Sequence, residues 1–479
     1  MLEPHEVAFP SLPLERFRDL IGERRYSDLQ TVAADTRALM GDGTIWNVNS
    51  TERGGGVAEM LQVLLGYSRG AGLDVRWMVL AGDPEFFSIT KRVHNRLHGA
   101  PGDDGELGPA QTDHYRKVVA ANAGALVAMV RPGDVVLLHD PQTVGLADAM
   151  RGAGVSVVWR CHVGSDHAND WTENAWAFLR PFVEDCHAWV FTRDAFVPHW
   201  LPKDRVAVIP PSIDPFSPKN EDLSPDEVRR ILVGIGAIAG GHDANGRRGE
   251  FIRRDGSVGH VVRRATIAPE GEPLDPAVPL VVQVSRWDHL KDMAGVMAGF
   301  ASQVVGRVDA SLALVGPSVA GVSDDPEGAE VLAECVAAWE ALGSEARRRV
   351  RLISLPMHDV DENAAMVNAL QSHASVIVQK SLAEGFGLTV AEGMWKAKTV
   401  VASAVGGIVD QITPGTGVLL DDPRDTDTFG TRLASLLQRP DELAAMGQRA
   451  RQHVIDGFLG DRHLVQYARL IGELRRPPG

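Results

Sequence analysis

The stretch Gln379-Lys380-Ser381-Leu382-Ala383-Glu384-Gly385-Phe386-Gly387-Leu388-Thr389-Val390-Ala391-Glu392 decides the fold of this chain. It continues an apolar run at 374–378 that predicts a buried strand, and a helical pattern begins near Gly387. A strand, a glycine-containing loop and a helix form the repeating unit of a doubly wound α/β domain. The glycines at 385 and 387 allow the backbone to approach a ligand closely.

The start of this helix predicts an anion site. The first N–H groups of a helix have no partner inside it, and they point at the ligand with the positive end of the helix dipole. Glu384 lies in the loop and Glu392 about one and a half turns into the helix. Two carboxylates beside an anion are costly unless they accept hydrogen bonds from hydroxyls, which a sugar and a ribose supply. Ordinary surface glutamates are an equally open interpretation of these two residues alone, but the whole stretch favours a diphosphate with hydroxyl-bearing neighbours.

Apolar runs separated by helical patterns occur in two series, at 44–209 and at 280–420. Each series predicts a parallel sheet covered by helices on both faces, so the fold class is α/β with two Rossmann-like doubly wound domains. Pro210-Pro211 is a rigid turn that suits a domain boundary. We therefore expect domains at 1–215 and 216–459 that face each other across a cleft, a common place for ligands.

Charged side chains follow the first strand of the second series, in Gln283-Val284-Ser285-Arg286-Trp287-Asp288-His289-Leu290-Lys291-Asp292. Both Arg286 and Lys291 could reach a diphosphate, and their charges would neutralise a leaving nucleoside diphosphate without a metal ion. A surface ion pair with Asp288 or Asp292 is the alternative. Ligands of doubly wound sheets bind at the carboxyl ends of strands, so the placement favours a ligand-binding role.

A glycine-rich loop in the first series, Asn49-Ser50-Thr51-Glu52-Arg53-Gly54-Gly55-Gly56, gives a weaker signal. Three glycines precede a helix, so Gly55 and Gly56 could approach a phosphate or a sugar. Glycine runs are also common in plain turns.

Two histidines end strands of the same series. His139, followed by Asp140, ends one strand and His162 ends the next. His162 could hydrogen-bond a sugar hydroxyl or assist a leaving group. Single histidines are more often structural, so the functional interpretation depends on the shared location of the two histidines at strand ends.

Composition limits the kind of protein. The 479 residues are 44% apolar and 23% charged, as in a soluble globular protein, and the net charge of −15 disfavours a nucleic-acid surface. No apolar run approaches the ~20 residues of a membrane span, and the amino terminus lacks a signal-peptide pattern. Three widely spaced cysteines favour reduced thiols. We therefore expect a cytoplasmic protein that binds neither nucleic acid nor membrane.

Three patterns resemble known sites but have simpler explanations. Gly234-Ile235-Gly236-Ala237-Ile238-Ala239 matches a dinucleotide fingerprint, but a capping box at 224–227 starts a helix that these glycines end, so we reject an NAD site. Asp359-Val360-Asp361 and Asp425-Thr426-Asp427 resemble metal-binding carboxylates. Neither has other ligands nearby, so loop and cap roles are the better interpretation.

Residues 236–278 interrupt the alternation of strands and helices. Phe251 to Val258 predicts a hairpin around an Asp-Gly turn. Arginine pairs at 247–248, 253–254 and 263–264 could form a basic flap, but a solvated surface hairpin is the better interpretation.

At these residues the chain resembles the family-four retaining glycosyltransferases of the GT-B fold. Glu384 to Glu392 is similar to that family's signature of two glutamates separated by seven residues, and Arg286 and Lys291 match its diphosphate-binding residues. A narrower resemblance links the chain to the trehalose glycosyltransferring synthases and the related trehalose phosphorylases. The segments that carry it are 46–51, 54–59, 82–87, 159–162 and 381–389.

The resemblance implies retaining transfer of glucose from a nucleoside diphosphate glucose to free glucose, which forms α,α-trehalose reversibly and without a metal or other cofactor. It also implies a homodimer and a final helix near 460–479 that packs back on the amino-terminal domain. The implied catalytic residues are Glu384, Arg286, Lys291 and His162. The implied donor-binding residues are Gly385, Phe386, Gly387, Leu388, Thr389, Glu392, Gly55 and Gly56, and the acceptor-binding residues are Asn49, His139 and Asp140.

Three alternatives stay open. A phosphorylase would place inorganic phosphate at Arg286 and Lys291, which could bind either anion. A glucosyltransferase with another small acceptor would use the same donor site. A catalytically silent sugar-nucleotide sensor is disfavoured, because Glu384, Arg286, Lys291 and Glu392 are all present.

Overall fold

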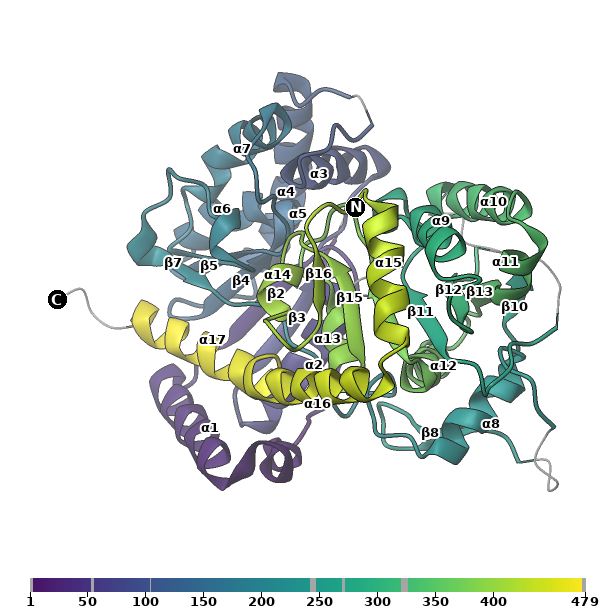
Figure 1. The fold of residues 1–479 in the computed structure, drawn as a ribbon. Coiled ribbons are helices and arrows are strands. Elements are labelled where there is room, and N and C mark those ends of the chain that lie inside the picture. Colours follow the sequence, from purple (N-terminus) through teal and green to yellow (C-terminus); the bar gives the residue numbers. More distant parts are fainter. Residues whose placement is uncertain are drawn as a thin grey trace. The chain divides into compact units, whose positions relative to one another are not determined.

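The computed structural model describes residues 3–52, 56–103, 105–241, 247–268, 272–319 and 326–475. The chain divides into two compact units (Figure 1). The amino-terminal unit comprises Met1–Ser212 and Phe458–Gly479, and the central unit comprises Ile213–Gly457.

The amino-terminal unit is built on a seven-stranded sheet in the order β1-β3-β2-β4-β5-β6-β7. Its strands are β1 (His5–Glu6), β2 (Ile45–Asn49), β3 (Val75–Val79), β4 (Val135–His139), β5 (Ser156–Cys161), β6 (Ala188–Phe191) and β7 (Val206–Val208). Its helices are α1 (Arg18–Met40), α2 (Gly56–Gly70), α3 (Pro84–Leu97), α4 (Pro109–Val127), α5 (Asp140–Thr143), α6 (Ala147–Gly152), α7 (Asp170–Val183) and α17 (Gly460–Arg475).

Both faces of this sheet are buried, because successive side chains of a strand point to opposite faces. Trp46 and Val48 of β2 belong to a core that α3, α4, α6 and α7 complete. Ile45 of the same strand belongs to a second core, which α1, α2 and α17 complete. Leu470 and Ile471 of α17 are members of that second core, so the last described helix is part of the amino-terminal unit.

The central unit holds a second seven-stranded sheet, in the order β10-β13-β12-β11-β14-β15-β16. Its strands are β10 (Thr266–Ala268), β11 (Leu280–Val284), β12 (Ser311–Pro317), β13 (Val350–Leu355), β14 (Val376–Gln379), β15 (Thr399–Ser403) and β16 (Val418–Leu420). Its helices are α8 (Pro225–Ile235), α9 (Met293–Gln303), α10 (Pro326–Glu340), α11 (Ser344–Arg349), α12 (Val360–His373), α13 (Leu388–Trp395), α14 (Ile408–Gln411), α15 (Thr426–Leu437) and α16 (Pro440–Gly457).

The sheets confirm the predicted doubly wound α/β architecture. Each sheet also has one antiparallel edge strand that lies outside the two predicted series, because β1 pairs antiparallel with β3 and β10 pairs antiparallel with β13. Every other neighbouring pair in the two sheets is parallel. The two edge strands have only two and three residues, too few to carry an apolar period that a sequence could reveal; both residues of β1 are exposed, and β10 has one exposed and two half-buried residues.

The rejected dinucleotide fingerprint and the two Asp-x-Asp patterns have the structural roles predicted for them. Helix α8 ends at Ile235, and Gly236 caps it in the left-handed region at φ +84°. The carboxylate of Asp359 caps α12 by accepting from the backbone N–H groups of Asp361 and Glu362. The carboxylate of Asp425 caps α15 in the same way, at 2.8 Å from the N–H of Thr428.

The predicted hairpin exists, with strands β8 (Glu250–Ile252) and β9 (Val258–His260), but its arginines are not simply solvated. The guanidinium of Arg253 contacts both carboxylate oxygens of Asp359, at 3.1 and 2.8 Å. Arg254 lies 3.1 Å from Asp361, and Arg263 forms an ion pair with the buried Glu362. The arginines therefore fix the hairpin to the start of α12 within the central unit.

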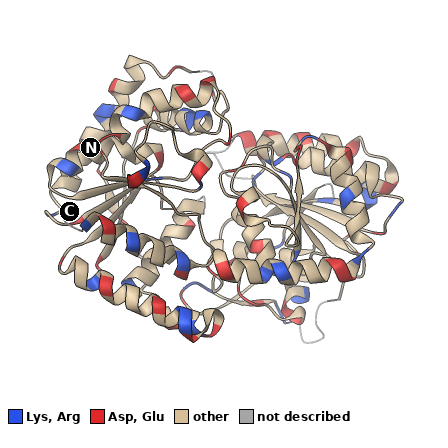
Figure 2. Ribbon diagram, turned by 60° about the vertical axis from the view of Figure 1, so that its left-hand side comes forward, with Lys and Arg blue, Asp and Glu red and all other residues tan. Residues whose placement is uncertain are grey.

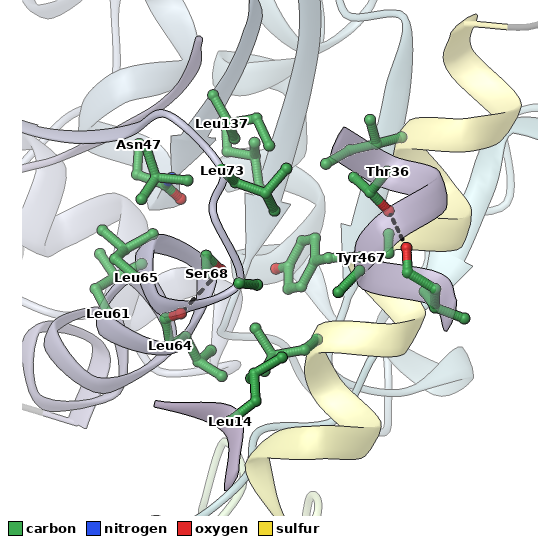
Figure 3. A pocket seen from close by; sticks show the side chains of 18 of the residues that line it. Leu14, Thr36, Asn47, Leu61, Leu64, Leu65, Ser68, Leu73, Leu137 and Tyr467 are labelled. Carbon is green, nitrogen blue, oxygen red and sulfur yellow. Dashed lines mark hydrogen bonds between the residues drawn. The ribbon is translucent and has the colours of Figure 1, made fainter. Parts of the chain in front are cut away.

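An apolar cavity of about 80 Å³ lies in the amino-terminal unit among α1, α2, α17 and the sheet (Figure 3). Ala33 of α1 and Ala468 of α17 are among the small side chains that line it. We expect Ala468→Leu to fill part of this space and to raise the free energy of unfolding by about 1 kcal/mol, which urea denaturation would measure. Ala34→Leu, at an exposed position of α1, is the control. A destabilised Ala468→Leu protein would show that the cavity walls cannot accept the added carbons.

Acidic and basic residues are interspersed over the helices of each unit (Figure 2). Among the described residues, no helix is long and apolar enough to span a membrane.

Candidate active site

The strand order of the central unit creates a switch point between β11 and β14. These strands are parallel neighbours, but the chain continues from β11 to β12 on one side and from β14 to β15 on the other. The loops that leave their carboxyl ends therefore diverge, and ligands of doubly wound sheets bind in the crevice so formed. The loop after β11 carries Arg286 and Lys291, and the loop after β14 carries Glu384.

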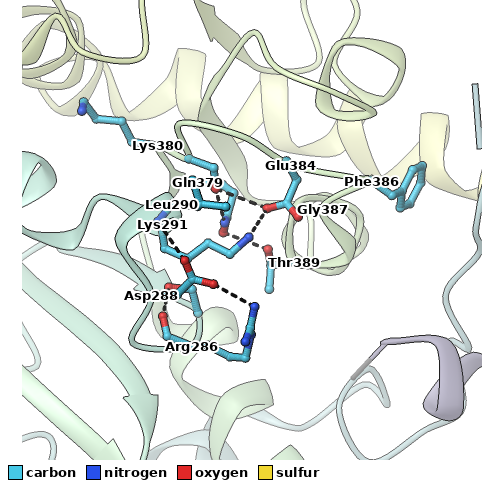
Figure 4. Close-up of polar contacts among 12 residues, drawn as sticks. Arg286, Asp288, Leu290, Lys291, Gln379, Lys380, Glu384, Phe386, Gly387 and Thr389 are labelled. Atoms are coloured by element: carbon cyan, nitrogen blue, oxygen red, sulfur yellow. Dashed lines mark hydrogen bonds and ion pairs between the residues drawn. The ribbon is translucent and has the colours of Figure 1, made fainter. Parts of the chain in front are cut away.

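The two loops meet in an ion pair between Lys291 and Glu384 (Figure 4). Lys291 Nζ lies 2.6 Å from Glu384 Oε2, and each side chain is 14% exposed. The hydroxyl of Ser381 donates to the same carboxylate oxygen at 3.3 Å. The cation and the carboxylate are thus held in a fixed, partly desolvated position, where a charge acts more strongly than in water.

Arg286 has a different environment from Lys291. Its Nη2 donates to Asp288 Oδ2 at 2.8 Å, so the ion pair considered as an alternative does form. The Arg286 side chain is nevertheless 66% exposed, and a ligand can reach it. Asp288 is held in place because its other oxygen accepts from the N–H of Leu290 at 2.8 Å. The adjacent Trp287 is buried and anchors the loop by donating to the carbonyl of Pro317 at 2.9 Å.

A buried polar bridge, which the sequence analysis missed, fixes the two loops to each other. The amide of Gln283 donates to the carbonyl of Lys291 at 2.7 Å and accepts from the N–H of Lys380 at 3.1 Å. The fully buried Lys380 forms an ion pair with Asp292, which lies in the left-handed region at φ +46°. Asp292 directly follows Lys291, so these contacts set the backbone from which Lys291 extends. A glutamine inside an apolar strand and a lysine at a strand end were the available signals.

The glycine loop before α13 lies against a second glycine loop. Gly387 caps α13 at φ +82°, which favours glycine. The N–H of Gly407 donates to the carbonyl of Gly385 at 3.0 Å. A β-carbon on Gly406 would lie 1.7 Å from the carbonyl oxygen of Glu384. Gly406 and Gly407 therefore belong to the site, and the predicted strand that ends before them was the only sequence signal.

Other predicted donor-binding side chains of this segment are partly engaged within the protein. The hydroxyl of Thr389 donates to Gln379 Oε1 at 2.8 Å. Phe386 is 6% exposed, and its carbonyl accepts from the amide of Gln411 at 2.5 Å. Leu388 is the first residue of α13 and is half-buried. These contacts leave the backbone of the loop as its principal means of binding a ligand.

Glu392 lies on α13 and is 5% exposed. Its Oε1 is 3.6 Å from Lys219 Nζ. Burial lowers the pKa of the neighbouring Lys396 to about 7, although the charge of Glu392 opposes that shift. Lys396 Nζ donates to Asn220 Oδ1 at 3.0 Å. Glu392 is therefore a buried side chain close to two lysines, and a ribose hydroxyl would be a suitable donor to it.

Three predicted residues of the amino-terminal unit lie together where the neighbouring strands β4 and β5 end. His139 Nδ1 lies 3.2 Å from His162 Nε2. The carboxylate of Asp140 accepts from the N–H of His162 at 2.8 Å. Burial raises the pKa of Asp140 to about 6, whereas burial and then the charge of Arg160 lower the pKa of His139 to about 3. The carboxylate is thus the group of this cluster that changes charge near neutral pH.

The remaining predicted residues lie at the start of α2. Asn49 ends β2, and both groups of its amide are engaged, with Trp77 Nε1 at 2.7 Å and the carbonyl of Thr51 at 2.7 Å. Gly56 is the exposed first residue of α2. Gly55 lies outside the described residues.

Comparison with known proteins places these features in a family. The profile "Trehalose synthase, N-terminal domain" matches residues 47–198, and "Glycosyl transferases group 1" matches residues 358–453. A trehalose synthase of Rubrobacter xylanophilus is 34% identical over 465 residues, which cover 96% of this chain and 97% of that protein. The chain belongs to the trehalose synthase family. It is a glycosyltransferase that acts in trehalose-related glycosyl transfer.

More distant relatives extend the comparison. A trehalose phosphorylase of Pleurotus pulmonarius is 26% identical over 97% of this chain and 62% of that protein. An α,α-trehalose-phosphate synthase (UDP-forming) of Burkholderia vietnamiensis superposes with a TM-score of 0.65 at 15% identity, covering 90% of this chain and 96% of that structure. The structural likeness supports the GT-B fold.

Proposed function

We propose that this enzyme transfers glucose, with retention, from a nucleoside diphosphate glucose to free glucose and forms α,α-trehalose reversibly. The observation that carries the proposal is the Lys291–Glu384 ion pair at the switch point of a chain from the trehalose synthase family. A fixed cation beside a helix start suits a diphosphate, and a carboxylate held beside it suits sugar hydroxyls.

The proposed chemistry needs charge stabilisation and no protein nucleophile. The bond between glucose C1 and the diphosphate oxygen breaks while the acceptor hydroxyl attacks C1 from the same face. The hydroxyl proton passes to the departing diphosphate, which balances the reaction. Lys291 and the accessible Arg286 stabilise the charge that develops on the diphosphate, without a metal ion or cofactor.

In this proposal each carboxylate binds a different part of the substrates. Glu384 and the backbone of Gly385–Gly387 hold the hydroxyls of the donor glucose. Glu392 holds the donor ribose. Asp140 accepts from the acceptor glucose, and His162 lies near the reacting sugar.

A trehalose phosphorylase is the second candidate, favoured by the likeness to the Pleurotus pulmonarius enzyme over 97% of this chain and 62% of that protein. Cleavage of trehalose separates the two. Trehalose would be incubated with a panel of nucleoside diphosphates or with inorganic phosphate, and the glucosyl product identified. We expect cleavage with at least one nucleoside diphosphate, and synthesis from the matching sugar nucleotide and glucose should yield an α,α-1,1 linkage by NMR. Cleavage with phosphate alone would overturn the proposal.

A further inference from the structure

Four buried side chains of the amino-terminal unit form a continuous chain of hydrogen bonds. Arg160 of β5 is fully buried, and its Nε donates to His162 Nδ1 at 3.3 Å. His162 Nε2 and His139 Nδ1 are 3.2 Å apart, and His139 Nε2 lies 3.0 Å from Asn47 Oδ1. The two imidazole planes differ by only 16°, with ring centroids 5.5 Å apart. The rings therefore lie edge to edge, as an N–H···N bond between them requires.

The arginine fixes the direction of every bond in this chain. A guanidinium can only donate, so His162 Nδ1 must be an acceptor and cannot carry a proton. The proton of His162 is then on Nε2 and is donated to His139 Nδ1. His139 carries its proton on Nε2 for the same reason and donates it to Asn47 Oδ1. Both imidazoles are consequently neutral, and each has both ring nitrogens engaged within the protein.

The chain supports Asp140, which joins it at two points. Asp140 directly follows His139, and its Oδ1 accepts from the N–H of His162 at 2.8 Å. Its backbone lies in the left-handed region at φ +64°, where its carbonyl accepts from Trp159 Nε1 at 3.0 Å. Among the described residues, no side chain or backbone group hydrogen-bonds Asp140 Oδ2, so this oxygen is available to a ligand hydroxyl.

We propose that Arg160 is a positioning residue, which orders the chain Arg160–His162–His139–Asn47 in one direction and so holds Asp140 ionised, with Oδ2 presented to an acceptor sugar hydroxyl. The proposal rests on the proposed function. Under this proposal neither His162 nor His139 transfers a proton in the reaction, because neither imidazole has a free nitrogen. It also gives the buried cation a counter-charge in Asp140.

The charged and titratable groups around Asp140 lie on three elements and on the loop after β5. They are His139 on β4, Arg160 and Cys161 on β5, His162 in that loop, and His463 and Tyr467 on α17. Burial lowers the pKa of all three histidines and raises the pKa of Tyr467, so these groups stay neutral near pH 7. Burial raises the pKa of Asp140 to about 6, and the charge of Arg160 opposes that rise. Turnover that needs the carboxylate is therefore present above this pKa and lost as the pH falls through it.

The experiment compares Arg160→Gln with Arg160→Lys across pH. Glutamine can still donate to His162 but has no charge, whereas lysine keeps the charge. We expect Arg160→Gln to move the acid limb of the pH profile of acceptor kcat/KM to higher pH. Acceptor kcat/KM of this variant should therefore fall about 10-fold more at slightly acidic pH than at alkaline pH. In Arg160→Gln, kcat/KM for the donor should fall less than kcat/KM for the acceptor. In Arg160→Lys, the acid limb should lie at the same pH as in the wild-type enzyme. Arg96→Gln, which removes another buried arginine of this unit, should leave the limb unchanged.

Histidine-selective ¹⁵N NMR of the wild-type protein tests the direction of the chain independently of turnover. We expect both imidazoles to give the neutral Nε2–H pattern near pH 7, assigned with His139→Gln and His162→Gln. A protonated ring or an Nδ1–H tautomer at either position would overturn the proposal, as would an unchanged acid limb in Arg160→Gln. If Arg160→Gln does not fold, the NMR pattern and the Arg160→Lys profile decide. Failure of wild-type enzyme to make trehalose would overturn the proposed function, while the NMR result would still test the chain.

Discussion

Replacing Lys291 by alanine is expected to lower kcat/KM for the nucleotide-sugar donor about 100- to 1,000-fold. Lys291 Nζ is fixed 2.6 Å from Glu384 at the switch point of the central unit, and under the proposed function it faces the charge that develops on the departing diphosphate. Alanine removes that cation and leaves Glu384 without its counter-charge. Steady-state rates of trehalose formation at several donor concentrations would measure the loss.

The control for this prediction is Lys203→Ala, which removes an exposed lysine of the amino-terminal unit. Urea denaturation of both variants would separate a loss of turnover from a loss of folding. Turnover of Lys291→Ala equal to that of Lys203→Ala would show that Lys291 has no part in the reaction.

Gly406→Ala is expected to lower turnover about 100-fold, because a misplacement of about 1 Å in a site can have an effect of that size. The added β-carbon would lie 1.7 Å from the carbonyl oxygen of Glu384 and 3.4 Å from that of Gly385. Gly406 also lies in the left-handed region at φ +51°, where alanine is strained. The loop that carries Glu384 must therefore move, and Glu384 moves with it.

Gly234→Ala provides the matched change at a tolerant position. Gly234 is inside α8, and a β-carbon there meets no atom within 4 Å. We expect this variant to keep its turnover and to gain about 0.5–1 kcal/mol of stability from helix propensity. A Gly406→Ala enzyme as active as Gly234→Ala would contradict the assignment of the second glycine loop to the site.

Much of the fold could be predicted because buried parallel strands have a strong local signal. β11 is an uninterrupted apolar run up to Gln283, and β14 is another up to Gln379. Residues at the carboxyl ends of neighbouring strands must meet, so the approach of Lys291 to Glu384 follows from strand order. The edge strands β1 and β10 lack that signal, because they have only two and three residues and neither is fully buried.

The missed residues act through tertiary contacts that no local pattern encodes. Lys380 is adjacent to a predicted strand, but its partner Asp292 is 88 residues away. Gly406 matters only because a different loop passes over it. Arg160 is part of a predicted strand, and its burial at 0% exposure depends on the elements packed around that strand. Residue type and position along the chain marked Lys380 and Gly406 at strand ends, but they did not identify the partners of these residues.

The return of α17 to the amino-terminal unit has a consequence for biosynthesis. The core of that unit includes Leu470 and Ile471, which a ribosome makes only after the whole of Ile213–Gly457. At typical elongation rates this interval is roughly 10–50 s. The unit whose synthesis starts first is therefore the last to be complete, and until then the surface that α17 covers must be kept from other contacts.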